Sequence, residues 1–328
     1  MQVNDKSRIY KELEQYDLER IVKYAFGQGA VITESHLLGG GLFNTTYFIA
    51  ISDPIQQLVL RVAPIRPDLL FDFEKTMMGV EAHLYEQMAQ VGVPVPNVIL
   101  YDNSRRVIDR EYQLAEFVPR SITYNDPSFP EEHRDRIQYD LGVYTARIHS
   151  IHADKFGWPQ PDGTVDGHDK WPDVLARFCS EIAQRCREHG VVDEAELVAF
   201  ERYLQDNLAL FELAEPPCLI HNDLWAQNIL VRPDERGSWE VAAIIDVDRA
   251  MYADREFEFA LWANEPHFME GYGRQMNASK ESEKRRIYYG TVGGLFSAYV
   301  FKVQYDNIQA FEDSKKWALD CLRRLDEN

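Results

Sequence analysis

The spacing of apolar residues changes near residue 119, from a strand-like pattern to a helical one. Residues 42–51 and 56–62 are rich in β-branched and aromatic residues and are separated by the turn signal Asp53-Pro54, a pattern typical of an antiparallel hairpin. Beyond residue 119, apolar residues recur every three or four positions, in a stripe that comprises Ile137, Leu141, Tyr144, Ile148 and Ile151. Strands that precede helices along a chain are typical of the α+β class. We therefore expect a small antiparallel sheet followed by a mainly helical region.

Helical segments are predicted in both regions. The first runs over 8–29 and ends at Gly27 and Gly29, and the second ends at Gly92. The apolar stripe of the second comprises Phe73, Met77, Val80, Leu84, Met88 and Val91. Later helical runs are predicted at 171–190, 193–213, 255–271 and 280–325.

Length and charge limit the class of protein. A chain of 328 residues exceeds the usual single-domain size, so we expect two domains, residues 1–118 and residues 119–328. The formal net charge is −19, which excludes nucleic acid as a partner because phosphate binding needs clustered Lys and Arg. The same charge permits a cationic small molecule to bind, although it can equally serve solubility alone.

Cysteine spacing and hydropathy limit the class further. The cysteines have neither CxxC spacing nor a histidine at metal-ligand spacing, so we expect no zinc site and no disulfide framework. The N-terminus is charged from its start, and no stretch approaches the roughly 18 apolar residues of a membrane span. We expect a cytoplasmic protein without membrane contact, as a monomer or a homodimer.

The residues that carry chemistry lie in LIHNDLWAQNIL (219–230) and VAAIID (241–246). The apolar runs NILV and VAAIID, joined by the turn RPDERGS, predict a hairpin that brings Asn228 near Asp246. Asp223 precedes them on the same loop. Amide and carboxylate oxygens suit Mg²⁺, which needs only one or two protein carboxylates, and Asp223 is left to accept a proton from an attacking hydroxyl. Phosphoryl transfer uses this division of roles.

HNDLWAQN followed by IIDVDRAMYADREFEFA resembles the aminoglycoside phosphotransferase and choline kinase-like family, relatives of the protein kinases. His221, Asp223 and Asn228 match the family's catalytic-loop pattern H-x-D-x-x-x-x-N, and Asp246 matches its metal-binding aspartate. The resemblance implies that Asp223 is the catalytic base and that Asn228 and Asp246 hold Mg²⁺. It also implies a two-lobed protein-kinase-like fold.

The resemblance extends to the first region. LLGGGLFNTTYFI resembles the hairpin that covers the nucleotide, and LVLRVAP resembles the strand that supplies a cation to the phosphates. The cation here is arginine where protein kinases have lysine, and its planar fork suits phosphate oxygens. QLAEFVP resembles the hinge between lobes, whose backbone meets adenine. The residues implied to bind ATP or GTP are Gly39, Gly40, Gly41, Asn44, Arg61, Glu81, Glu116, Phe117 and Val118.

The expected activity is transfer of the γ-phosphoryl group from ATP or GTP to a hydroxyl of a small molecule. No long activation segment follows Asp246, so a folded protein substrate is not expected. The segments at 155–210 and 254–268 are predicted to form the acceptor pocket. Its polar and aromatic side chains would suit an amine-bearing or sugar-like acceptor, and those assigned to it are Asp254, Glu258, Trp262 and Glu265.

Several alternatives stay open. The leading acceptor is an antibiotic of aminoglycoside, macrolide or nucleoside type, and the alternative is a metabolic acceptor of choline, homoserine, fructosamine or sugar type. A pseudokinase that only binds its ligand needs none of Asp223, Asn228 and Asp246. His221 is predicted to brace its loop rather than to react. Asp248 is either a second metal ligand or a turn residue, and Asp254 has an alternative structural role in holding the catalytic loop.

Overall fold

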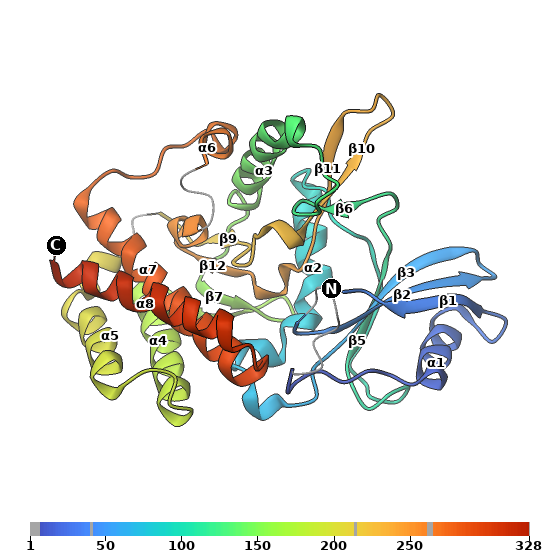
Figure 1. Ribbon diagram of the computed structural model, residues 1–328, viewed down its shortest axis with the longest axis horizontal. Helices are drawn as coiled ribbons and strands as arrows, with labels where there is room; N and C mark the ends of the chain where they lie inside the picture. Colours follow the sequence, from blue (N-terminus) through green and yellow to red (C-terminus); the bar gives the residue numbers. More distant parts are fainter. Residues whose placement is uncertain (1–6, 40–41, 213–214, 261–264, 328) are drawn as a thin grey trace. The chain divides into compact units, whose positions relative to one another are not determined.

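The computed structural model describes residues 7–39, 42–212, 215–260 and 265–327 (Figure 1). The chain divides into two compact units. The first unit comprises Met1–Phe129 and Ala226–Asp248, and the second comprises Pro130–Trp225 and Arg249–Asn328. The predicted β-hairpin after the catalytic loop therefore packs with the N-terminal sheet region. The functional division predicted at residue 118 stays a prediction.

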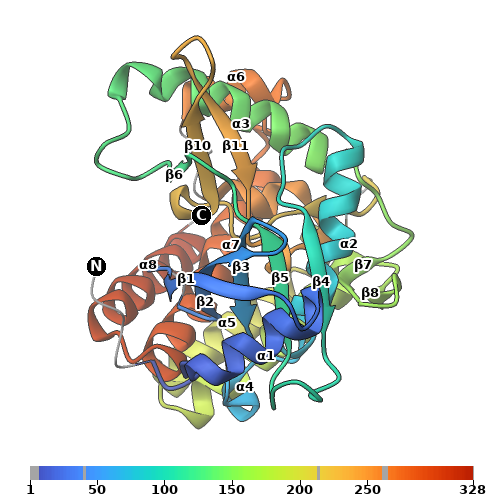
Figure 2. The same ribbon diagram turned by 90° about the vertical axis from the view of Figure 1, so that its right-hand side faces the viewer.

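A five-stranded antiparallel sheet forms the body of the first unit, in the order β1-β2-β3-β5-β4. Its strands are β1 (Val31–Leu37), β2 (Thr45–Ser52), β3 (Gln56–Val62), β4 (Val98–Asp102) and β5 (Tyr112–Glu116). Helix α1 (Gln15–Phe26) packs against one face of this sheet (Figure 2). Leu58 and Leu60 of β3 belong to that face. Because successive side chains of a strand point to opposite faces, Arg61 projects from the other face. There it is in register with Gln113 of β5.

The rest of the first unit is helix α2, a second sheet and short 3₁₀ turns. Helix α2 (Met77–Gln90) buries Met77, Val80, Leu84 and Met88 of the predicted stripe. The second sheet has the order β11-β10-β6. The remaining elements are η1 (Pro67–Leu69), η2 (Phe73–Lys75), β6 (Ile122–Thr123), η5 (Ala226–Asn228), β10 (Ile229–Pro233), β11 (Trp239–Ile244) and η6 (Val247–Arg249).

The second unit is mainly helical around a small antiparallel sheet of order β8-β7-β12-β9. The sheet strands are β7 (Phe156–Pro159), β8 (Val165–His168), β9 (Cys218–Ile220) and β12 (Met251–Ala253). The helices are η3 (Glu131–His133), α3 (Arg134–Ile148), α4 (Trp171–Glu188), α5 (Glu194–Asp206), η4 (Leu208–Phe211), η7 (Arg255–Ala260), α6 (Pro266–Tyr272), α7 (Lys280–Tyr299), the π-helical segment η8 (Val300–Gln304) and α8 (Ile308–Glu327).

The structure differs from the predicted helices at both ends of the chain. The helix expected over 8–29 begins only at Gln15. Residues 8 and 9 form a turn, and the Leu13 N–H donates to the Tyr47 hydroxyl over 2.6 Å rather than to a helical carbonyl. The helix expected over 280–325 is two helices joined through η8, and α7 and α8 pack against each other. The β7–β8 hairpin was not predicted either.

The α+β class, with an antiparallel N-terminal sheet and a mainly helical C-terminal region, is confirmed. Among the described residues, no helix combines the length and the apolar character needed to cross a bilayer.

Candidate active site

The hairpin predicted after the catalytic loop is formed by β10 and β11 of the first unit, with Ile229 paired to Ile244. Asn228 directly precedes β10, and its carbonyl accepts a hydrogen bond of 2.9 Å from the Ile245 N–H. Asp246 is the next residue along the chain. Antiparallel pairing therefore brings Asn228 and Asp246 to the same end of one hairpin, as the sequence indicated.

Arg61 of β3 is surrounded by three carboxylates of the first unit, and we call these four residues the Arg61 cluster. One guanidinium nitrogen, Nη1, donates to Oε2 of Glu81. The other, Nη2, lies 2.7 Å from Oδ1 of Asp246 and 2.8 Å from Oδ2 of Asp248. The planar fork of arginine makes this arrangement possible, because its two terminal nitrogens point to different partners.

Glu81 is fully buried on α2, so its ion pair with Arg61 is not a surface contact. Its carboxylate also accepts hydrogen bonds from Nε2 of Gln113 and, over 2.7 Å, from the hydroxyl of Tyr85. Burial raises the pKa of Glu81, and the nearby Asp248 and Asp246 add to this rise while Arg61 opposes it. Three donors hold this carboxylate in one orientation.

The Arg61 cluster has more negative than positive groups. Burial alone would lower the pKa of Arg61, but Asp246, Glu81 and Asp248 raise it well above its usual value, so the guanidinium stays charged. Three carboxylates with a single guanidinium carry a formal excess of two negative charges when ionised, which a divalent cation would compensate. The Asp246 side chain keeps 34% of its surface exposed, whereas that of Asp248 keeps 5%.

The donor set at the hairpin end fits Mg²⁺. Asp246 offers a partly exposed carboxylate and Asn228 an amide, and Mg²⁺ binds through few protein oxygens while retaining waters. Among the described residues, no three His, Cys, Asp or Glu side chains are grouped as ion ligands. The predicted ligand pair does not require such a group, because one of its members is an asparagine.

The backbone at Asp246 has a left-handed conformation, with φ of 59°. Residues other than glycine seldom adopt it, because the Cβ atom is crowded by the backbone. The Asp246 N–H donates a hydrogen bond of 3.0 Å to the hydroxyl of Tyr85. This contact joins α2 to the loop after β11. Tyr85 was not identified from the sequence, where its position on α2 indicates only a core residue.

The first part of the predicted catalytic loop, His221 to Asp223, lies in the second unit directly after β9. His221 is fully buried, and its Nδ1 atom accepts a hydrogen bond of 3.3 Å from the Asp223 N–H. Asn222 has φ of 62°, and its side-chain amide donates to the Arg249 carbonyl over 3.2 Å. The Asp223 residue itself is half-buried. His221 thus contacts the backbone of the loop, in line with the bracing role predicted for it.

Glu258 holds this loop from η7. Its buried carboxylate accepts hydrogen bonds from the N–H groups of His221 and Asn222, the latter over 3.1 Å. His149 of α3 lies behind it, with Nε2 at 3.7 Å from the same carboxylate. The loop-holding role considered for Asp254 therefore belongs to Glu258. Asp254 and Glu256, which precede Glu258 in the chain, have other partners.

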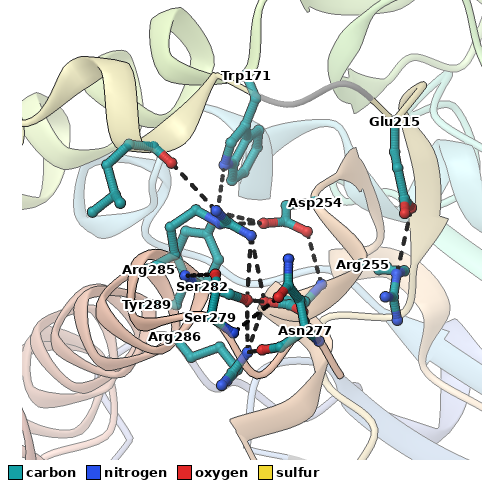
Figure 3. Close-up of polar contacts among 12 residues, drawn as sticks. Trp171, Glu215, Asp254, Arg255, Asn277, Ser279, Ser282, Arg285, Arg286 and Tyr289 are labelled. Atoms are coloured by element: carbon teal, nitrogen blue, oxygen red, sulfur yellow. Dashed lines mark hydrogen bonds and ion pairs between the residues drawn. The ribbon is translucent and has the colours of Figure 1, made fainter. Parts of the chain in front are cut away.

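Asp254 lies in a buried polar network with side chains of α4 and α7 (Figure 3), and Glu256 joins this network through its contacts with α7. Asp254 accepts hydrogen bonds from the Tyr289 hydroxyl over 2.8 Å and from the Glu256 N–H over 3.0 Å. Burial raises the pKa of Asp254, although these hydrogen bonds and Arg285 oppose the rise. Glu256 lies 3.0 Å from Nη1 of Arg286. Both carboxylates are thus engaged within the second unit.

The other predicted binding residues are distributed as follows. Glu265 accepts a hydrogen bond of 3.0 Å from Nε2 of Gln138, and Gly39 lies in the exposed turn after β1. Asn44 is buried, with its amide nitrogen 3.5 Å from Oδ2 of Asp248. Gly40, Gly41 and Trp262 lie outside the described residues.

Of the predicted hinge residues, Glu116 is the last residue of β5, and Phe117 and Val118 follow it directly. Two of their N–H groups already donate within the first unit: that of Glu116 to the Asn97 carbonyl over 2.9 Å, and that of Phe117 to the Gln57 carbonyl over 3.1 Å. The Val118 carbonyl accepts from the Ser121 hydroxyl over 2.8 Å. These bonds fix the backbone of the segment.

A family model described as "Phosphotransferase enzyme family" matches residues 35–285. Among curated proteins, Acyl-CoA dehydrogenase family member 10 of Mus musculus is 25% identical over 65% of this chain and 18% of its own length. Acyl-CoA dehydrogenase family member 11 of Gallus gallus is 27% identical over 63% of this chain and 24% of its own. The chain therefore spans less than a quarter of the length of either relative.

Solved structures share the fold at low sequence identity. The apo form of a thermostable mutant of aminoglycoside phosphotransferase APH(4)-Ia has a TM-score of 0.67 and 18% identity, with 93% of this chain and 98% of that chain covered. A Thermobifida fusca YX-ER1 protein assigned as a fructosamine-3-kinase has a TM-score of 0.62 and 18% identity, with 92% and 99% covered. The expected protein-kinase-like fold is confirmed.

Proposed function

Because the chain belongs to the phosphotransferase enzyme family and is thereby a small-molecule phosphotransferase, we propose that it transfers the γ-phosphoryl group of ATP or GTP to an acceptor hydroxyl. The Arg61 cluster carries this proposal. It holds a charged guanidinium between Glu81 and the loop of Asp246. Such a group offers two N–H donors to the α- and β-phosphates of a nucleotide.

Each site residue has a proposed role. Asp223 accepts the proton of the acceptor hydroxyl as the oxygen forms its bond to the γ-phosphorus and the bond to the β-phosphate oxygen breaks. His221, Asn222 and Glu258 hold the loop that carries Asp223. Asn228 and Asp246 would hold Mg²⁺, which when bound neutralises phosphate charge. The Glu116 carbonyl and the Val118 N–H are proposed to contact the base.

We propose an amine-bearing sugar as the acceptor class. The formal charge of −19 is compatible with a cationic acceptor. The solved structures of the same fold include a complex of APH(4)-Ia with AMP-PNP and hygromycin B, with a TM-score of 0.66. An antibiotic of aminoglycoside type is therefore the leading candidate. A glycated amine of fructosamine type is the second, since proteins assigned as fructosamine-3-kinases share the fold.

The proposal is tested by incubating the purified protein with ATP or GTP, Mg²⁺ and a panel of aminoglycosides, fructosamines and simple amino alcohols. A phosphorylated product is heavier than its acceptor by about 80 Da, which mass spectrometry detects. We expect such a product from at least one amine-bearing sugar. Nucleotide binding without transfer to any hydroxyl compound would favour the pseudokinase alternative.

A further inference from the structure

Tyr85 connects two groups that the proposed reaction needs in fixed positions. Its hydroxyl donates to Oε1 of Glu81 over 2.7 Å and accepts from the Asp246 N–H over 3.0 Å. A phenol hydroxyl has one proton to donate and lone pairs to accept, so both bonds form together. The residue is buried, with 5% of its surface exposed. The hydroxyl therefore lies between the partner of Arg61 and the backbone of the proposed metal ligand.

The protonation state of Tyr85 is compatible with this position. Burial and the neighbouring Glu81 carboxylate raise its pKa well above 10, so the phenol stays neutral through the physiological range. A neutral phenol keeps the proton that it donates to Glu81. The two hydrogen bonds thus run in one direction: the Asp246 N–H donates to Tyr85, and Tyr85 donates to Glu81.

The bond to the Asp246 N–H falls at the one residue where the loop takes a left-handed turn. That conformation is strained for a residue with a Cβ atom and persists where surrounding contacts enforce it. The N–H and the carboxylate belong to the same residue, so fixing the peptide also limits the directions in which the Asp246 side chain can point.

We propose that Tyr85 is a positioning residue, whose hydroxyl fixes the Asp246 peptide so that the Asp246 carboxylate is oriented for a divalent metal. This inference rests on the proposed function. It assigns Tyr85 no contact with substrate. Loss of the Tyr85 hydroxyl should weaken metal binding and change nucleotide affinity little, because the hydroxyl is linked to Arg61 through Glu81.

Tyr85→Phe removes the hydroxyl and keeps the ring. Binding of Mn²⁺ to the full-length protein in the presence of ADP is measured by calorimetry, and ADP binding is measured separately without metal. We expect the dissociation constant for Mn²⁺ to rise about five- to tenfold, which matches the loss of one or two hydrogen bonds. The dissociation constant for ADP without metal should change by less than about twofold.

Two further variants isolate the cause. Tyr112→Phe is matched in chemistry: Tyr112 lies in the same unit, is fully buried, and donates to a carboxylate, Oδ2 of Asp102, over 3.0 Å. It should leave Mn²⁺ affinity at the wild-type value. Gln113→Met removes another donor to Glu81 without touching Asp246, and so measures the part of the effect that passes through Glu81 alone. Thermal unfolding verifies that each variant is folded.

The results separate the two proposals. Wild-type Mn²⁺ affinity in folded Tyr85→Phe, or an equal loss in Gln113→Met, would overturn the positioning role and leave the proposed function standing. A wild-type protein that binds neither ADP nor Mn²⁺ with ADP would overturn the proposed function, and this inference with it.

Discussion

At the scale of single residues, Asp248 completes the set of carboxylates around Arg61 in the first unit. Its buried carboxylate contacts Nη2 of Arg61 and approaches the amide of Asn44. The roles of second metal ligand and of turn residue stay predictions. Nη2 of Arg61 thus has a buried carboxylate partner in Asp248. A lysine at position 61 has no second terminal nitrogen to pair with it. Side-chain contacts of this kind cannot be read from spacing, because they depend on three separate segments meeting.

Asp248→Asn is expected to loosen Arg61 while leaving its ion pair with Glu81. Loss of a charge-assisted hydrogen bond should raise the KM for nucleotide about tenfold, equivalent to ~1.4 kcal/mol, with a smaller fall in kcat. Steady-state kinetics at saturating Mg²⁺ measures both. An unchanged KM for nucleotide together with a raised Mg²⁺ requirement would instead identify Asp248 as a metal ligand.

At the scale of elements, η7 contacts the loop that is proposed to be catalytic, because Glu258 accepts hydrogen bonds from two of its N–H groups. Glu258→Gln keeps one acceptor oxygen but removes the charge that binds two backbone N–H groups. We expect kcat to fall about tenfold or more, with the KM for nucleotide little changed, because the nucleotide-binding residues proposed above lie in the other unit. Kinetics of phosphoryl transfer measures this.

Glu256→Gln is the matched control for that experiment. Glu256 is as buried as Glu258 but contacts Ser282 and Arg286 of α7 rather than the catalytic loop. The control should lower thermal stability with a smaller effect on kcat. If both variants lost kcat equally, the loop-holding role of Glu258 would be wrong.

The close packing of α7 on α8 gives a second prediction at this scale. A Cβ atom at Gly294 would lie 2.7 Å from the Cβ of Ala318, whereas one at Gly293 would meet only the Trp317 ring, at 3.6 Å. Gly294→Ala should therefore lower the free energy of unfolding by about 1–3 kcal/mol. Gly293→Ala should be neutral or stabilising by up to about 1 kcal/mol, since alanine favours the helix. Chemical denaturation measures both, and equal effects would contradict the packing described.

At the scale of the whole molecule, the order of strands before helices and the two ends of the β10–β11 hairpin could be predicted from the sequence. Local periodicity and turn residues determine these features. The pairing of β10 with β6 could not, because it joins residues more than a hundred positions apart. Nor could the β7–β8 hairpin, where a Cβ atom at Gly167 would lie 1.7 Å from the Phe156 carbonyl oxygen. Gly167 pairs with Gly157 inside this hairpin, and the spacing of residue types does not reveal how closely two backbones approach.

Only part of the candidate site could be predicted, because residue spacing reveals local elements but not side-chain contacts between them. The hairpin spacing indicated Asn228 and Asp246, and the resemblance to a kinase family indicated Arg61 and Glu81 as nucleotide-binding residues, but not the contacts that surround them. Tyr85 was missed because a tyrosine on a buried helix stripe carries no signal of its hydrogen-bond partners. The meeting of Asp223 with Asn228 and Asp246 around a metal stays a prediction.

The most direct test of the central claim is the effect of Asp223→Asn on phosphoryl transfer to the acceptor that the wild-type protein modifies. A general base contributes about 100- to 10,000-fold, so we predict a fall in kcat of at least about 100-fold, with nucleotide affinity within about threefold of the wild type. Turnover by Asp223→Asn close to that of the wild type would contradict the account.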